Sequence, residues 1–121
     1  MTLIEFLTAR LDEDELVARS CATERWTVKD GWHDGLDMEV LSSTYPACIE
    51  PEEATHTARH DPARVLAEVE AKRRIVDAAQ RNPHAPWDAY AIGRDDLGRR
   101  ALRALALPYA DHPDFDEGWR P

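Results

Sequence analysis

The stretch HDPARVLAEVEAKRRIVDAAQR, residues 60–81, predicts the longest helix of the chain because it has a start, an apolar side and an end. Asp61 can accept hydrogen bonds from the first free amides, and Pro62 lacks an N–H at a position where a helix does not use one. Pro83 disfavours helical torsions at the residue before it, so the helix should end there. The sequence therefore predicts a continuous helix over residues 62–81.

The apolar side of this helix consists of valines. At about 100° per residue, Val65, Val69 and Val76 fall within one narrow stripe. Lys72 and Arg73 lie at the edges of this stripe, where their aliphatic stems can run along apolar surface while the charged ends reach water or a carboxylate. The valine side should therefore face the core, and the other segments should pack against it.

Length and cysteine content narrow the class of protein. A chain of 121 residues is expected to form a single domain with one core. No apolar run approaches the roughly 20 residues that span a bilayer, and the first residues do not form a basic, then apolar leader, which predicts a soluble cytoplasmic protein. Cys21 and Cys48 are too few for a disulfide scaffold or a four-cysteine zinc site, so we expect two partly buried thiols.

Negative charge is concentrated in the N-terminal half. Residues 1–61 contain 14 acids and 5 Lys or Arg (net −9), whereas residues 62–121 contain 10 of each (net 0), which gives the formal net charge of −9. A chain of this charge repels phosphate backbones, so nucleic-acid binding is disfavoured. Two basic groups could still form a local basic face, although such residues are more often a solvated helix surface. The groups are Lys72, Arg73 and Arg74, and Arg94, Arg99, Arg100 and Arg103.

Residues 3–21 predict a second helix. Thr2 and Glu5 have the T-x-x-E spacing of a capping box, which marks a helix start. Asp14 projects onto the apolar side of this helix, and the sequence offers no partner for it. The apolar side itself is expected to consist of Leu3, Leu7, Leu11, Ala18 and Cys21.

Two further helices are predicted. Residues 51–60 begin with Pro-Glu-Glu, which suits a first turn. Asp95 or Asp96 can cap a helix over residues 95–106, which Pro108 terminates. The apolar face of that last helix is expected to consist of Leu97, Ala101, Ala104 and Leu105.

Residues 23–50 predict strands. β-prone residues occur in three runs, and two Asp-Gly pairs between them are turn signals. Trp26 and Trp32 would anchor the strands to the helices, or, alternatively, form an exposed aromatic pair that grips a ligand. The predicted fold class is therefore α+β: a helical domain of about four helices packed on a small two- or three-stranded antiparallel meander. The strands are expected at residues 25–28, 37–42 and 46–50.

The first candidate site is a set of histidines. Glu52, His56 and His60 recur every four residues and would share one face of the short helix. Imidazoles four residues apart can chelate zinc or another divalent metal, Glu52 can supply an oxygen, and His33 could join from the meander. The hydrolytic H-E-x-x-H motif is absent, because no glutamate follows the first histidine of the pair. The alternative interpretation is that these histidines are structural.

The second candidate site is the C-terminal segment, which we define as residues 107–121. Tyr109, Phe115 and Trp119 are too many aromatic residues for a disordered end, so the segment should wrap back over the domain. The alternative is that these three rings form a partner-binding segment.

Three segments together resemble a family of small uncharacterised proteins of actinobacteria and their phages, which carries only a domain-of-unknown-function label. They are ARHDPARVLAEVEAKRRIV, LRALALPYADHPDFDEGWRP and FLTARLDEDE. The resemblance spans most of the chain and implies no known activity. Relatives with a Cys-x-x-Cys and a further cysteine before the last helix would suggest a metal knuckle. Residues 82–96 contain no cysteine here and offer only His84, so that site is not carried over.

The sequence contains no familiar catalytic constellation. There is no G-x-S-x-G, no Gly-rich phosphate loop and no nucleophile with an adjacent base. The favoured interpretation is a small non-enzymatic protein-interaction module whose acidic N-terminal half or aromatic tail meets a basic or apolar protein partner. The alternative is a divalent-metal-binding protein or metal-dependent enzyme that uses Glu52, His56 and His60. No cofactor is predicted apart from zinc at that site.

Overall fold

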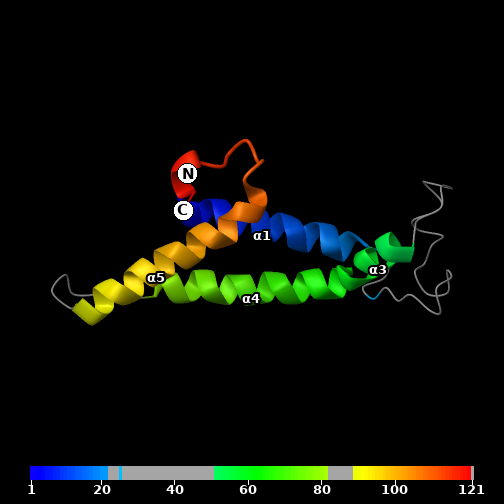
Figure 1. Cartoon of the computed structure of the whole chain (residues 1–121), viewed down its shortest axis with the longest axis horizontal. Helices are drawn as coiled ribbons and strands as arrows, with labels where there is room; N and C mark the ends of the chain where they lie inside the picture. The colour runs from blue at the N-terminus through cyan, green and yellow to red at the C-terminus, as the bar shows by residue number, and fades with distance from the viewer. Residues whose placement is uncertain (22–24, 26–50, 82–88, 121) are drawn as a thin grey trace. The chain divides into compact units, whose positions relative to one another are not determined.

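A computed structural model describes residues 1–21, 25, 51–81 and 89–120 (Figure 1). This part of the chain is built from α-helices and short 3₁₀ helices. None of the described helices is long and apolar enough to cross a bilayer. The elements are α1 (Leu3–Ser20), α3 (Pro51–Arg59), α4 (Pro62–Gln80), α5 (Ala89–Ala106) and the 3₁₀ helices Leu107–Tyr109 and Glu117–Trp119.

The predicted α+β fold class is wrong, because the structure is helical and its described residues contain no strand. Apart from Arg25, which is in neither a helix nor a strand, the three predicted strands lie outside the described residues. Trp26, Trp32 and Cys48 also lie outside them, while Cys21 is a half-buried free thiol. The physical reason for the correction is that apolar side chains of α1, α4 and α5, such as Phe6, Val69 and Leu102, are buried among the helices and the C-terminal segment.

Contacts divide the chain into two compact units, which we describe separately. The first unit comprises Met1–Asp14 and Glu68–Pro121, and the second comprises Glu15–Ala67. Helices α1 and α4 are each continuous and contribute one part to each unit. Helix α4 comprises Pro62–Gln80, so it begins at the predicted residue and ends one residue before the predicted end of the range 62–81.

Side-chain caps start two of the helices, as the sequence predicted. At α1, the Thr2 amide donates to Glu5 Oε2 at 2.7 Å and the Glu5 amide donates to Thr2 Oγ1 at 3.2 Å, which confirms the capping box. These hydrogen bonds to Thr2 lower the pKa of the Glu5 carboxyl. At α4, the Arg64 amide donates to Asp61 Oδ1 at 2.8 Å, which confirms the predicted cap. Both caps pair backbone amides that have no partner within the helix.

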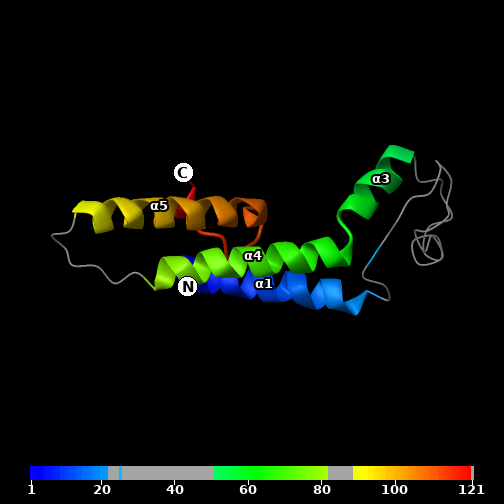
Figure 2. The same ribbon diagram turned by 90° about the horizontal axis from the view of Figure 1, so that it is seen from below.

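Three helices enclose the core of the first unit. Figures 1 and 2 show the first part of α1 and the second part of α4 side by side, with α5 crossing them. The side chains that these helices direct inward are apolar and buried. Full burial of a Leu, Val or Phe side chain contributes about 1.5 to 3 kcal/mol to the free energy of folding. The buried residues are Phe6, Leu7, Leu11, Val69, Val76, Leu102 and Ala106.

The valine stripe predicted for α4 faces the core in the first unit. Val69 and Val76 are only 2% and 5% exposed. The flanking charges end on carboxylates, as their positions at the edge of the stripe predicted. Arg73 Nη2 lies 2.6 Å from Asp12 Oδ1, and Lys72 Nζ forms a looser ion pair with a glutamate one turn earlier, at 3.9 Å.

The predicted apolar face of α5 is wrong. Leu97 is 68% exposed, whereas Leu102 and Ala106 are buried and form the core side of the helix. Gly98 of α5 lies beside Ala79 of α4, since a Cβ placed on Gly98 would be in ordinary van der Waals contact with Ala79 Cβ, at 3.8 Å. The core side of α5 is therefore the one that lies against the neighbouring helices.

The second unit has its own small buried cluster. Ala18 of α1, Asp61 and Pro62 are buried there. Asp61 is a polar residue at only 5% exposure, and its hydrogen bond to the Arg64 amide accounts for the burial. The corner between α3 and α4 is thus fixed by the same residue that caps α4.

Candidate functional site

The histidines predicted as metal ligands line one open pocket in the second unit. The pocket has a volume of about 460 Å³. The imidazole rings of His56 and His60 lie 4.4 Å apart, centroid to centroid, with an angle of 34° between their planes. The helical spacing of four residues therefore brought them together as expected. The pocket lining is Glu52, Thr55, His56, Arg59, His60 and Arg64.

The search for a metal site covers three of the four predicted ligands, Glu52, His56 and His60. Among the described residues, no group of three or more His, Cys, Asp or Glu is placed to hold a metal ion. His33, the fourth predicted ligand, lies outside the described residues. Binding of zinc at Glu52, His56 and His60 stays a prediction.

The aromatic residues of the C-terminal segment surround Phe6. The Phe6 ring is fully buried, and its centroid lies 6.4 Å from that of Tyr109, 5.9 Å from Phe115 and 4.9 Å from Trp119. His112 adds a fourth ring at 5.8 Å. The first three rings are those predicted from the sequence, and each is half-buried. In this structure they contact a helix of their own chain.

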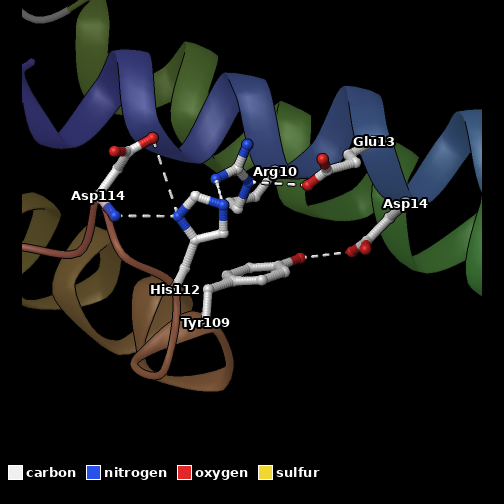
Figure 3. Close-up of polar contacts among 6 residues, drawn as sticks. All are labelled: Arg10, Glu13, Asp14, Tyr109, His112 and Asp114. Carbon is white, nitrogen blue, oxygen red and sulfur yellow. Dashed lines mark hydrogen bonds and ion pairs between the residues drawn. The ribbon is translucent and has the colours of Figure 1, made fainter.

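Two polar contacts join the C-terminal segment to α1 (Figure 3). The Tyr109 hydroxyl donates to Asp14 Oδ2 at 2.5 Å, and Arg10 Nη1 donates to His112 Nε2. The first contact accounts for the acid that projects onto the apolar side of α1. Asp14 accepts a hydrogen bond from a half-buried phenol, so the carboxylate is not left without a partner.

Arg10 and His112 are held on more than one side. Arg10 stacks over the Phe6 ring at 5.5 Å. Its buried Nε lies 3.1 Å from Glu13 Oε2, close enough for an ion pair but not aligned for a hydrogen bond. His112 Nδ1 lies 3.1 Å from the Asp114 amide. A neutral imidazole has one acceptor nitrogen, so it satisfies Arg10 in one tautomer and the Asp114 amide in the other.

The sequence did not single out Arg10 or His112. The one signal that pointed to this network was Asp14, because an acid on an apolar helix face requires a donor from another segment. Nothing in the local pattern identified Tyr109 as that donor.

Burial, and then the hydrogen bond to Asp14, raises the pKa of the Tyr109 phenol above its usual value of 10.0. The folded chain therefore keeps this proton at pH values where the unfolded chain loses it. The stabilisation is complete below about pH 10 and is lost as pH rises further, by less than the limiting slope of about 1.4 kcal/mol per pH unit for one proton. Urea denaturation from pH 8 to 11 should show this loss in the wild type and a flatter profile in Tyr109→Phe. Parallel profiles would contradict it.

An apolar cleft lies in the first unit, and we refer to it as the α4–α5 cleft. Its volume is about 390 Å³. Asp95 and Arg99 are its charged lining residues. Leu97 and Ile75 line it and remain 68% and 42% exposed. The other described lining residues are Ile4, Ala78, Ala79, Gly98, Ala101 and Leu102.

Several residues of the two predicted basic groups form ion pairs with carboxylates of the chain. Lys72, Arg73 and Arg74 each form an ion pair with a carboxylate of the first unit. On α5, Arg100 pairs with Asp96 at 2.8 Å. Four of the described residues in the two basic groups therefore have a carboxylate partner within the chain, and nucleic-acid binding stays a prediction.

The sequence profile of a family of unknown function, DUF6221, matches residues 1–121. No curated protein and no solved structure matches the chain.

Proposed function

Because this chain belongs to DUF6221, a family of unknown function, we propose a role from the geometry of its own residues. It is a non-enzymatic module that binds a protein partner, and the partner inserts apolar side chains into the α4–α5 cleft. The observation that carries this proposal is the exposure of two large aliphatic side chains, Ile75 and Leu97, in a cleft lined mainly by apolar residues.

Burial of these side chains would supply binding free energy. Removing a Leu or Ile side chain from water contributes about 1.5 to 3 kcal/mol when burial is complete. Apolar surface that is concave and contiguous is typical of interaction sites, whereas single exposed side chains are not. Among the described lining residues, Asp95 and Arg99 are the only charged ones, and they are not a pair suited to proton transfer.

The acidic residues of α1 are the reason why the proposed partner contact is not placed in the acidic N-terminal half. Asp12 pairs with Arg73, Glu13 with Arg10, and Glu15 with Arg19. Asp14 accepts from Tyr109, and Glu5 belongs to the capping box. Each acid of α1 already has an intramolecular partner, so a basic partner would have to compete for it.

The Leu97→Asp variant is expected to weaken partner binding at least about tenfold, which corresponds to 1.4 kcal/mol. The charge would have to be buried on binding, whereas in the free protein it lies in water. A photoreactive phenylalanine derivative at position 97, irradiated in a lysate of the source cells, should give a protein adduct, identified by mass spectrometry, that Ile75→Asp abolishes.

Leu16 provides the matched control. It is 70% exposed, close to the value for Leu97, but it lies on α1 in the second unit. Leu16→Asp should leave binding unchanged, and a photoreactive residue at position 16 should not give the same adduct. Identical adducts from both positions, or none from position 97, would contradict the proposal.

A further inference from the structure

The pocket at the corner of α3 and α4 is locally cationic. Among the described lining residues, Arg59 and Arg64 contribute two positive charges and Glu52 one negative charge, so these residues carry a net positive charge even with both imidazoles neutral. The whole chain, in contrast, has a formal net charge of −9. The field of an acidic protein does not attract anions from a distance. An anion in this pocket would therefore be held by direct contacts with the cationic side chains.

Hydrogen bonds to the end of α3 fix two of the lining side chains. His60 Nδ1 lies 2.8 Å from the His56 carbonyl oxygen. A carbonyl only accepts, so Nδ1 is the donor and carries the proton. Arg64 Nη1 donates to the Arg59 carbonyl oxygen at 3.1 Å. The Arg64 amide is held by the buried Asp61 as well. A pocket whose walls are already ordered loses less side-chain entropy when a ligand binds.

We propose that this pocket binds a phosphate group, either as the free ion or as a small phosphomonoester. The guanidinium groups of Arg59 and Arg64 are its charge contacts, since their planar N–H donors match phosphate oxygens in pairs. The Arg59 guanidinium makes no ion pair or hydrogen bond to the described residues, so its donors are available. This site lies in the second unit and is separate from the proposed protein-binding cleft.

The same lining disfavours a divalent cation. A metal ion beside two guanidinium groups is repelled, and Glu52 is the only carboxylate among the described residues that line the pocket. The described residues also lack a group of three suitable ligands. Glu52 therefore has opposite effects in the two cases: it repels a bound phosphate but would help to hold a zinc ion.

Titration of the full chain with inorganic phosphate at constant ionic strength, followed by calorimetry, tests the proposal. Arg59→Gln should weaken binding about tenfold, and Glu52→Gln should strengthen it several-fold, because like charge near the ligand is removed. Arg74→Gln is the matched control. Arg74 lies on α4 and pairs only with Glu70 at the surface, so its removal should leave phosphate binding unchanged.

Two further arms make the outcome decisive. Phenyl phosphate in place of inorganic phosphate distinguishes an ester ligand, which would bind more tightly, from the free ion. Zinc alone, titrated into wild type and Glu52→Gln, tests the opposite charge. Thermal melts of each variant establish that it is folded. The proposal is overturned if Arg59→Gln leaves phosphate affinity unchanged, if Glu52→Gln weakens it, or if zinc binds and phosphate does not.

Discussion

Phe6→Ala is expected to lower the free energy of unfolding by about 3 to 5 kcal/mol. The Phe6 ring is fully buried and touches rings from four residues of the C-terminal segment. Alanine would leave a cavity there and remove the edge-to-face contacts that fix the segment on α1. Since a domain of this size is stable by about 5 to 15 kcal/mol, this loss is a large share of the total.

Urea denaturation followed by circular dichroism measures this effect. Leu16→Ala, on the same helix but 70% exposed, is the control and should change stability by no more than about 0.5 kcal/mol. Phe6→Leu retains most of the buried volume and should fall between the two. A loss below about 1 kcal/mol for Phe6→Ala would mean that the ring cluster does not hold the segment.

Trp119→Ala is expected to cost about 2 to 3 kcal/mol, somewhat less than a fully buried aromatic residue. The Trp119 ring lies 4.9 Å from Phe6 and 5.5 Å from Phe115, but it is only half-buried. This variant separates the two interpretations of the C-terminal aromatic residues. Removing a ring that packs within the chain lowers the free energy of unfolding, whereas removing a ring that contacts only a partner does not.

Stability and partner capture should be measured on the same Trp119→Ala protein. A double-mutant cycle with Phe6→Leu should give a coupling free energy of about 0.5 to 1.5 kcal/mol. Arg120→Ala is a neighbouring control, because its ion pair with Glu117 is exposed, and exposed pairs are typically worth less than about 1 kcal/mol. Unchanged stability combined with loss of a partner would instead assign Trp119 to partner binding.

The helix starts were readable from the sequence because they are local. Thr2 with Glu5, and Asp61 with Pro62, place each capping group within three residues of the amide that it satisfies. The α+β fold class was wrong for the opposite reason. It depended on β-propensity, which carries little information without the surface that a segment packs against.

The apolar face of α5 shows a second limit of periodicity. Of the predicted face, Ala101 and Leu105 are half-buried and Ala104 is exposed, so a 100° repeat did not select the buried side. Leu97 and Leu102 are the same residue type, yet the first is 68% exposed and the second 6%. The difference depends on which side of α5 lies against the neighbouring helices, and the sequence of α5 alone does not contain that information.

At the candidate sites, contacts within one segment were predictable from the sequence, whereas contacts between distant segments were not. His56 and His60 were brought together by a spacing of four residues within one segment, which a helical pattern predicts. The contact between Arg10 and His112 spans 102 residues, and no local pattern identifies it. Asp14 marked the position of a missing donor without revealing which residue would supply it.

The long separation between Phe6 and its ring partners also orders events during synthesis. Helix α1 leaves the ribosome before the residues that cover Phe6, which are numbered 109–119. Until they have been translated, the nascent chain presents an uncovered phenylalanine to solvent, chaperones and other nascent chains. Closing this contact requires a large loop to form late, so the C-terminal segment should be the last part of the first unit to dock.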